Sequence, residues 1–112
     1  MKITEEPVED ILVFTISGNL DSDTINDATV QMNAWLERGW TQFVGDLRNL
    51  QYITSAGLLL LFTLGKKAAE GGGGLCLCNV RDQVEHVFDV CGLPDKIPVA
   101  DSREQAMRTV RG

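Results

Sequence analysis

The sequence predicts an α/β fold with a mostly parallel or mixed sheet, because strand segments alternate along the chain with helical ones. The strand segments are short apolar runs, and the helical segments carry apolar residues at a spacing close to one helical turn. The clearest strand, residues 11–17, is apolar on both faces, which is typical of a strand covered on both sides. A length of 112 residues fits one domain, so we expect residues 1–112 to fold as one unit.

The N-terminal part of the chain predicts two strands joined by a turn. The polar start predicts a short edge strand up to Pro7, and Glu9-Asp10 follows as the turn. Successive side chains of residues 11–17 then point to opposite faces and form the first buried strand. We expect this strand to end at Gly18-Asn19-Leu20-Asp21, because glycine, asparagine and aspartate favour turns.

The middle of the chain predicts two helices around a second buried strand. Side-chain oxygens at Ser22-Asp23-Thr24 can cap the first helix, and Gly39 ends it. The strand covers residues 42–47, and a loop is expected from there to Ser55. Residues 56–69 then form a helix that is apolar on most faces, as helices in a protein core are.

The C-terminal part predicts a third buried strand and two further helices. Residues 75–80 form the strand, and Asp82 is expected to cap the next helix, which ends at Gly92. A short apolar link at residues 97–99 is the place for a minor strand. Asp101-Ser102-Arg103-Glu104 then resembles a capping box and opens the last helix.

Composition and charge argue against several classes of protein. Ten basic and 16 acidic residues give a net charge of −6, which disfavours binding to nucleic acid or to anionic lipid. The longest apolar stretch, Ala56 to Leu64, is much shorter than the roughly 20 residues of a membrane-spanning helix. The acidic start, Met1 to Glu6, lacks the apolar core of a secretion signal, so we expect a cytoplasmic protein without membrane insertion.

The sequence indicates no metal site and no cofactor. Cys76 and Cys78 form a C-x-C pair rather than the C-x-x-C pair of redox or zinc sites, and His86 is the only histidine. We expect both cysteines to be small core residues. The glycine run 71–74 follows a helix and precedes a strand, which is the reverse of a phosphate-binding loop, so a flexible connection is expected.

Ser55 is distinguished by its position, because it follows an irregular loop and precedes a predicted helix. Backbone N–H groups at a helix start have no partner within the helix, and the helix dipole is positive there, so this position favours a phosphate. Gly57 removes a side chain from the first turn and lets another backbone or a ligand approach. Ser55 can therefore accept a phosphate or, like most serines before apolar helices, simply cap the helix.

Asp21 and Asp46 each follow a predicted strand and are candidate neighbours of Ser55. Loops that follow parallel strands line one edge of an α/β sheet, and ligands bind at that edge. Because Ser55 follows the same strand as Asp46, the three residues can share the edge. Either carboxylate can instead accept hydrogen bonds from a loop backbone, as carboxylates in turns commonly do.

Three motifs resemble those of the STAS family, which includes anti-sigma factor antagonists and domains of sulfate transporters. The longest motif is DLRNLQYITSAGL at residues 46–58, and the others are GNLD at 18–21 and VFDVCGL at 87–93. They occur in the family's order and spacing, and the resemblance spans nearly the whole chain. It implies a STAS-like (SpoIIAA-like) domain, in which about four helices flank a central mixed sheet of four to five strands.

In soluble bacterial members of this family, a serine at the position of Ser55 is phosphorylated. The resemblance therefore implies phosphorylation of Ser55, with Thr54 as a less favoured acceptor. Many members carry an acidic residue before the serine and a hydroxyl after it, whereas this chain has Thr54 and Ala56. The implied phosphorylation-site neighbourhood and partner-binding surface consists of Asp21, Asp46, Thr54, Ala56 and Gly57.

The resemblance implies a phosphorylation-switched anti-sigma factor antagonist, which regulates transcription indirectly by partner switching. Such a protein binds an anti-sigma factor serine kinase when Ser55 is unphosphorylated and releases it when Ser55 is phosphorylated. A PP2C-type serine phosphatase reverses the modification. We expect a monomer that makes no direct contact with nucleic acid, although the sequence does not determine the oligomeric state.

Two alternative functions belong to other classes. STAS-like proteins also serve as adaptor subunits of lipid-transport ATPases or of signalling assemblies, without a phosphorylation switch. An enzyme with Ser55 as its nucleophile is the other alternative. We expect no enzyme, because His86 lies in a different predicted helix and no G-x-S-x-G motif surrounds the serine.

Overall fold

In the computed structural model, which describes residues 1–112, strands and helices follow the predicted order with one additional strand. The strands are β1 (Lys2–Val8), β2 (Ile11–Leu20), β3 (Gln42–Asp46), β4 (Leu50–Ile53), β5 (Gly74–Cys78) and β6 (Val99–Ala100). The helices are α1 (Ile25–Glu37), α2 (Ser55–Glu70), α3 (Asp82–Cys91) and α4 (Arg103–Arg111), and a 3₁₀ turn, η1 (Leu93–Asp95), follows α3.

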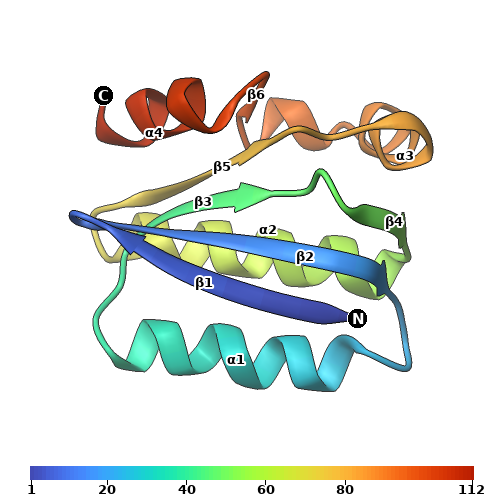
Figure 1. Cartoon of the computed structure of the whole chain (residues 1–112), viewed down its shortest axis with the longest axis horizontal. Helices are drawn as coiled ribbons and strands as arrows, with labels where there is room; N and C mark the ends of the chain where they lie inside the picture. The colour runs from blue at the N-terminus through green and yellow to red at the C-terminus, as the bar shows by residue number, and fades with distance from the viewer.

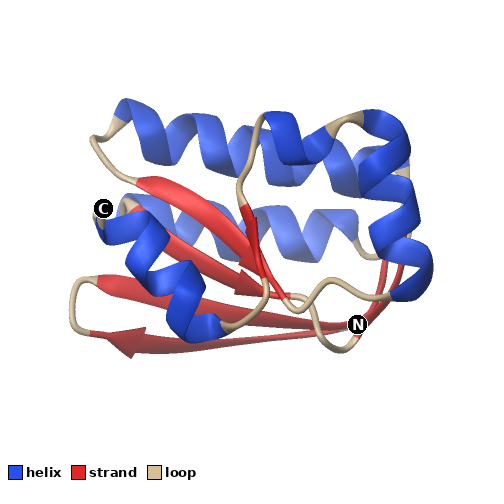
Figure 2. Ribbon diagram, turned by 90° about the horizontal axis from the view of Figure 1, so that it is seen from above, coloured by secondary structure: helices blue, strands red, loops and turns tan.

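The strands form one mixed sheet (Figure 2). β1 and β2 form an antiparallel hairpin at one edge, and β3, β5 and β6 continue the sheet parallel to β2, while β4 pairs with the end of β2. The outermost strand, β1, exposes Lys2, Glu5, Glu6 and Pro7. This arrangement confirms the predicted α/β fold with a mixed sheet, and β4 and β6 bring the sheet to six strands.

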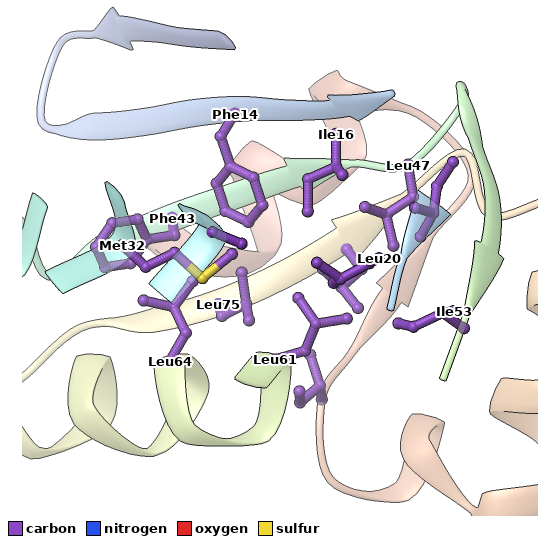
Figure 3. Close-up of a cluster of buried hydrophobic side chains, with 14 of the residues drawn as sticks. Phe14, Ile16, Leu20, Met32, Phe43, Leu47, Ile53, Leu61, Leu64 and Leu75 are labelled. Carbon is purple, nitrogen blue, oxygen red and sulfur yellow. The ribbon is translucent and has the colours of Figure 1, made fainter. Parts of the chain in front are cut away.

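Helices cover both faces of the central strands (Figure 1). Phe14 and Ile16 of β2 belong to the core formed with α1 and α2, whereas Ile11 and Val13 belong to a second core formed with α4. On the first face, the ring of Trp35 in α1 lies against that of Phe14, with 5.0 Å between the centroids. Figure 3 shows the side chains of this larger core between the sheet and α2. Burying each such side chain contributes roughly 1.5 to 3 kcal/mol, so the two cores fix the helices on the sheet.

The prediction of a loop between residue 47 and Ser55 is wrong, because β4 lies within it. β2 also continues to Leu20 instead of ending at Gly18, and the extension provides the pairing partner of β4. Gly18 has a φ of +94°, and the pairing register shifts between Gly18 and Asn19. An irregularity within a strand therefore occurs where the sequence indicated a turn.

The ends of the last two helices agree only in part with the predictions. Gly92 has a φ of +74° and ends α3 in the left-handed conformation that glycine favours. Ser102 caps α4, because its hydroxyl accepts a hydrogen bond from the backbone N–H of Gln105 at 3.2 Å. Asp82 does not cap α3, since the position before that helix is Arg81 and no side-chain cap bond forms.

Cys76 and Cys78 are buried in the core under α4, as the sequence predicts, whereas Cys91 at the end of α3 is exposed. Burial raises the pKa of both buried thiols. For Cys78, the negative charge of Asp46 adds to the effect of burial and raises the pKa to about 12. The thiolate is the reactive form of cysteine, so both buried thiols should be inert near neutral pH.

We therefore expect iodoacetamide at about pH 8 to modify only Cys91 in the folded protein. Intact-mass spectrometry should show one adduct in buffer and three in guanidinium chloride, because the chain has three cysteines. A folded Cys91→Ser variant should take up no label and serves as the control. Alkylation of Cys76 or Cys78 in the folded chain would contradict the burial of these thiols.

Candidate functional site

Ser55 is the first residue of α2, and its side chain is exposed. The cap position before the helix is Thr54, whose N–H and hydroxyl both donate to the carbonyl oxygen of Leu20, at 3.0 and 3.4 Å. No side-chain hydrogen bond caps the helix. The alternative interpretation of Ser55 as the helix cap is therefore wrong, and its hydroxyl faces solvent beside the N–H groups of the first turn.

Gly57 places the first turn of α2 directly against the sheet. It is buried, and a Cβ atom at this position would lie 2.7 Å from Cγ1 of Ile53 and 2.9 Å from the carbonyl oxygen of Leu20. Any side chain here would push the helix start away from β2 and β4. The close approach that the sequence predicts at Gly57 is thus an approach of the protein's own backbone.

β4 sets the position of Ser55, although the pattern of apolar residues does not reveal this strand. Leu50 and Ile53 of β4 pair with Gly18 and Leu20 of β2, and both β4 residues are buried. The strand ends at Ile53, two residues before Ser55. Pairing with β2 on one side and the contact at Gly57 on the other therefore hold the start of α2 in place.

Two large apolar side chains are exposed on the two elements that flank Ser55 in the chain. Leu59 follows it by four residues on α2, so both side chains are on the same side of the helix. Tyr52 precedes it by three residues on β4, and the exposed fractions are 65% for Leu59 and 46% for Tyr52. We call Tyr52, Ser55, Ala56 and Leu59 the Ser55 surface. Exposed apolar side chains on the segments around a free hydroxyl are suited to contact another protein.

The sequence prediction did not identify Tyr52 and Leu59. Residues 56–69 were expected to form a core helix because they are apolar on most faces, yet the residues that α2 buries are Gly57, Leu61, Leu64 and Ala68. A helix buries one stripe, and apolar residues beyond that stripe must lie elsewhere. The excess of leucines in this segment was the signal for an exposed apolar surface.

Asp21 lies next to the start of α2 and closes the turn before α1. Its Oδ1 atom accepts hydrogen bonds from the N–H groups of Asp23 and Thr24, at 3.0 and 3.2 Å. The hydroxyl of Thr24 in turn accepts from the N–H of Asp21 at 3.0 Å. The preceding residue, Leu20, accepts both hydrogen bonds from Thr54. The Asp21 carboxylate therefore accepts hydrogen bonds from the loop backbone, which is one of the two roles that the sequence predicts for it. The residue also follows Leu20, which binds the segment before Ser55.

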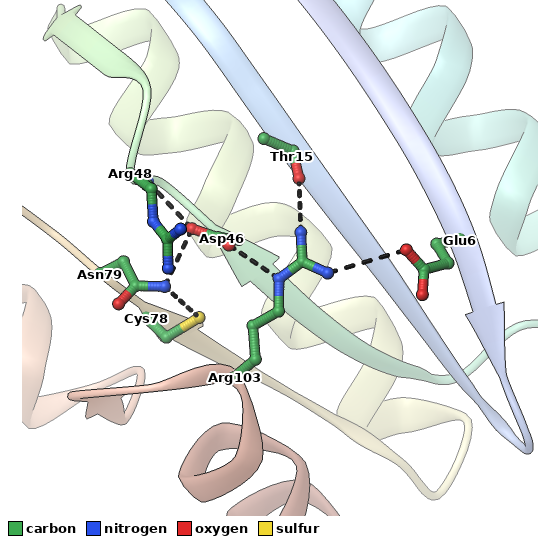
Figure 4. A network of polar contacts seen from close by, with 7 residues as sticks. All are labelled: Glu6, Thr15, Asp46, Arg48, Cys78, Asn79 and Arg103. Carbon is green, nitrogen blue, oxygen red and sulfur yellow. Dashed lines mark hydrogen bonds and ion pairs between the residues drawn. The ribbon is translucent and has the colours of Figure 1, made fainter.

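The side chain of Asp46 lies under α4, on the face of the sheet opposite to the one that α1 and α2 cover (Figure 4). Its carboxylate accepts hydrogen bonds from Nε of Arg103 at 2.8 Å, from the N–H of Arg48 at 3.0 Å and from Nδ2 of Asn79 at 3.2 Å. Burial raises the pKa of Asp46, but these hydrogen bonds and the charge of Arg103 outweigh burial and lower it. The Asp46 carboxylate thus lies on the face of the sheet covered by α4, whereas α2, which begins with Ser55, packs on the other face.

No group of three or more histidine, cysteine, aspartate or glutamate side chains is arranged to hold a metal ion. His86 lies on α3, and Ser55 begins α2. None of the helices is both long enough and apolar enough to cross a bilayer.

Comparison with known proteins shows where this chain belongs. The STAS domain model matches residues 2–106. BtrV of Bordetella bronchiseptica, named as a candidate anti-sigma factor antagonist, is 32% identical over 106 residues, which are 95% of this chain and 91% of BtrV. An anti-sigma F factor antagonist of Paenibacillus polymyxa is 29% identical over 108 residues, which are 96% of this chain and 92% of that protein.

Solved structures show the same fold. A candidate anti-sigma factor antagonist from Thermotoga maritima superposes with a TM-score of 0.91 at 20% identity, over 98% of this chain and 95% of that chain. The anti-sigma factor antagonist SpoIIAA in its unphosphorylated form gives 0.76 at 20% identity, over 99% of both chains. SpoIIAA from Bacillus in its phosphorylated form gives 0.74 at 20% identity, over 98% of this chain and all of that chain.

The family model, the related sequences and the solved structures each match nearly the whole chain. The relatives are named as antagonists of another protein. The chain is therefore a member of the STAS domain family and a homologue of the anti-sigma factor antagonists.

Proposed function

We propose that this protein is an anti-sigma factor antagonist that phosphorylation of Ser55 switches off. In this proposal the Ser55 surface binds an anti-sigma factor serine kinase and so frees the sigma factor that the kinase holds. One observation carries the proposal. Ser55 is exposed and its hydroxyl does not cap the helix, and the segments on either side of it carry the exposed side chains of Tyr52 and Leu59. The names of the relatives support an anti-sigma factor as the partner.

The unmodified surface suits docking. Tyr52 and Leu59 can bury apolar area against the kinase, and a tyrosine is a common anchor of protein interfaces. Docking also brings the Ser55 hydroxyl to the kinase, which transfers the terminal phosphoryl group of its own Mg-ATP to that oxygen. Thr54 is the less suitable acceptor, because its hydroxyl is half-buried and donates to Leu20.

Phosphorylation changes the charge of this surface by roughly −1.5 to −2 near neutral pH. The start of α2 can stabilise the phosphate by about 0.3 to 1 kcal/mol. Docking would nevertheless remove the phosphate from water against an apolar contact, which costs more unless the partner supplies matching charges. Asp21, close to the start of α2, adds like-charge repulsion. The phosphorylated protein is therefore released, and a PP2C-type phosphatase restores binding.

Variants of Ser55 test this proposal. Ser55→Ala should take up no phosphate from the cognate kinase and ATP, yet bind that kinase within about threefold of the unmodified protein. Ser55→Asp should bind at least about tenfold more weakly, which corresponds to about 1.4 kcal/mol. Phosphate uptake is measured by mass spectrometry, and affinity by calorimetry with the kinase that the native chain captures.

Thr54→Val is the matched control, because it removes the neighbouring hydroxyl and keeps Ser55. It should still be phosphorylated. If Ser55→Ala is phosphorylated as fast as the native protein, the proposed site is wrong. If the native chain copurifies with a transport ATPase and captures no kinase, the adaptor function is correct and the switch is not.

A further inference from the structure

A second surface feature lies along the C-terminal half of α2, the helix that Ser55 begins. A cleft of about 710 Å³ opens where the last turns of α2, the start of β5 and the end of α4 meet. These three segments lie at the same end of the molecule (Figure 1). Lys66 in the cleft follows Ser55 by 11 positions, about 16 Å along a helix, and none of the cleft's lining residues belongs to the Ser55 surface.

The cleft exists because two elements stop short of filling it. β6 pairs only with Leu77 and Cys78, which leaves the outer side of Gly74 and Leu75 at the start of β5 without a neighbouring strand. Within α2, Gly65 faces the cleft, and a Cβ atom there would lie 3.6 Å from Ile97, which is an ordinary contact distance. Packing therefore does not require a glycine at this position, although glycine weakens a helix. Its effect is to keep the cleft open.

The lining combines an apolar floor with two basic side chains. Phe62, Leu75, Ile97 and Val110 supply apolar surface, and Lys66 and Lys96 lie at the rim. Neither lysine belongs to any of the ion pairs of the protein.

The absence of acidic residues in this cleft is unusual for the chain. Its 13 lining residues include no aspartate or glutamate, although acidic residues outnumber basic ones by 16 to 10 in the whole sequence. Four other clefts each place a carboxylate beside their basic side chains. The lining of this cleft therefore combines positive charge with apolar surface and includes no acidic residue.

We propose that this cleft binds a small amphipathic carboxylate, such as a medium-chain fatty acid. The apolar chain would lie over Leu75 and Ile97, and the carboxylate would lie between the amino groups of Lys66 and Lys96. The volume is in the range of roughly 300 to 1,000 Å³ that is usual for small-molecule sites. The apolar floor and the absence of an arginine disfavour a bare inorganic anion, because no planar fork of donors is present to hold it.

Titration with dodecanoate below its micelle-forming concentration tests the proposal. Amide NMR signals of Leu75 and Ile97 should shift and saturate, and bound dodecanoate should slow the alkylation of Cys91, which also lines the cleft. Dodecyltrimethylammonium has the same chain with a positive head group and should bind at least about tenfold more weakly. Gly65→Leu should abolish binding by filling the cleft, and the double variant Lys66→Gln, Lys96→Gln should weaken it about tenfold.

Three results would overturn the proposal. These are the absence of saturable shifts at the cleft, equal affinity for the cationic detergent, and shifts centred on Tyr52 and Leu59 instead. Circular dichroism confirms that each variant is folded, and the lysine variant keeps the test valid if Gly65→Leu misfolds. The folded cleft variants should still be phosphorylated at Ser55, so failure of this proposal is distinguishable from failure of the proposed function.

Discussion

Gly57→Ala should destabilise the folded protein by about 2 kcal/mol, even though alanine is the better helix former. The added Cβ would lie 2.9 Å from the carbonyl oxygen of Leu20, which belongs to the backbone of β2 and cannot rotate away. It would also lie 2.7 Å from Cγ1 of Ile53. The first turn of α2 must therefore move off the sheet, and the cost of that movement exceeds the gain in helix propensity.

Gly65→Ala provides a matched control on the same helix. There the added Cβ meets Ile97 at 3.6 Å, so the change should stabilise the protein by up to about 1 kcal/mol. Denaturant unfolding followed by circular dichroism measures both variants, and the two substitutions should have opposite signs. Equal effects would mean that helix propensity, and not contact with β2 and β4, governs Gly57. Under the proposed function, the displaced helix start in Gly57→Ala should also weaken binding of the proposed kinase partner.

Asp46→Ala should cost about 2 to 3 kcal/mol of unfolding free energy. The carboxylate is 3% exposed and accepts hydrogen bonds from Arg103, Arg48 and Asn79. Its removal leaves a guanidinium and two N–H donors without their acceptor. The expected cost is below that of a fully buried ion pair, because the side chain of Arg103 is 37% exposed and can regain water.

Glu6→Ala is the control for this second prediction. Glu6 also contacts Arg103, at 3.7 Å, but its side chain is 65% exposed. The variant should therefore lose at most about 0.5 kcal/mol. If urea unfolding shows equal losses for Asp46→Ala and Glu6→Ala, the buried hydrogen bonds do not stabilise the fold as we infer.

The contribution of Asp46 to the free energy of unfolding should decrease at low pH. Its pKa in the folded protein lies below the ordinary value of 3.8. A carboxyl group with a lowered pKa stabilises the fold fully above its unfolded pKa, and the contribution is lost as the pH falls through the folded value. The stability difference between native protein and Asp46→Asn should thus be constant above about pH 5 and shrink below about pH 4. A difference that grows on acidification would contradict this assignment.

The fold was largely predictable because its strongest signals are local. Alternation in residues 11–17 predicted a strand covered on both faces, and Gly92 and Ser102 marked helix ends that the structure contains. β4 was not predictable in the same way. It has four residues, of which only Leu50 and Ile53 are buried, and it forms because β2 continues past an irregular Gly18. Pairing between segments that are far apart in the chain is not visible in the residue pattern of either segment.

The candidate site shows the same division between local and distant information. The position of Ser55 at a helix start follows from the nearby sequence and agrees with the structure. Alternation along β3 places Asp46 on the same face as Val44, but the local sequence does not show that α4 covers this face and brings Arg103, 57 positions further along the chain, to the carboxylate. The exposure of Leu59 depends on which stripe of α2 meets the sheet, and several stripes of that helix are apolar enough to do so.

The exposed residues of β1 affect whether copies of the protein can associate through the edge of the sheet. A bare strand edge invites a second copy to add its own strand, which is the first step toward fibrils. Here the edge carries the charged side chains of Lys2, Glu5 and Glu6, which an added strand would have to accommodate, and Pro7 has no N–H to donate. The free protein should therefore remain dispersed in the intervals when no partner covers it.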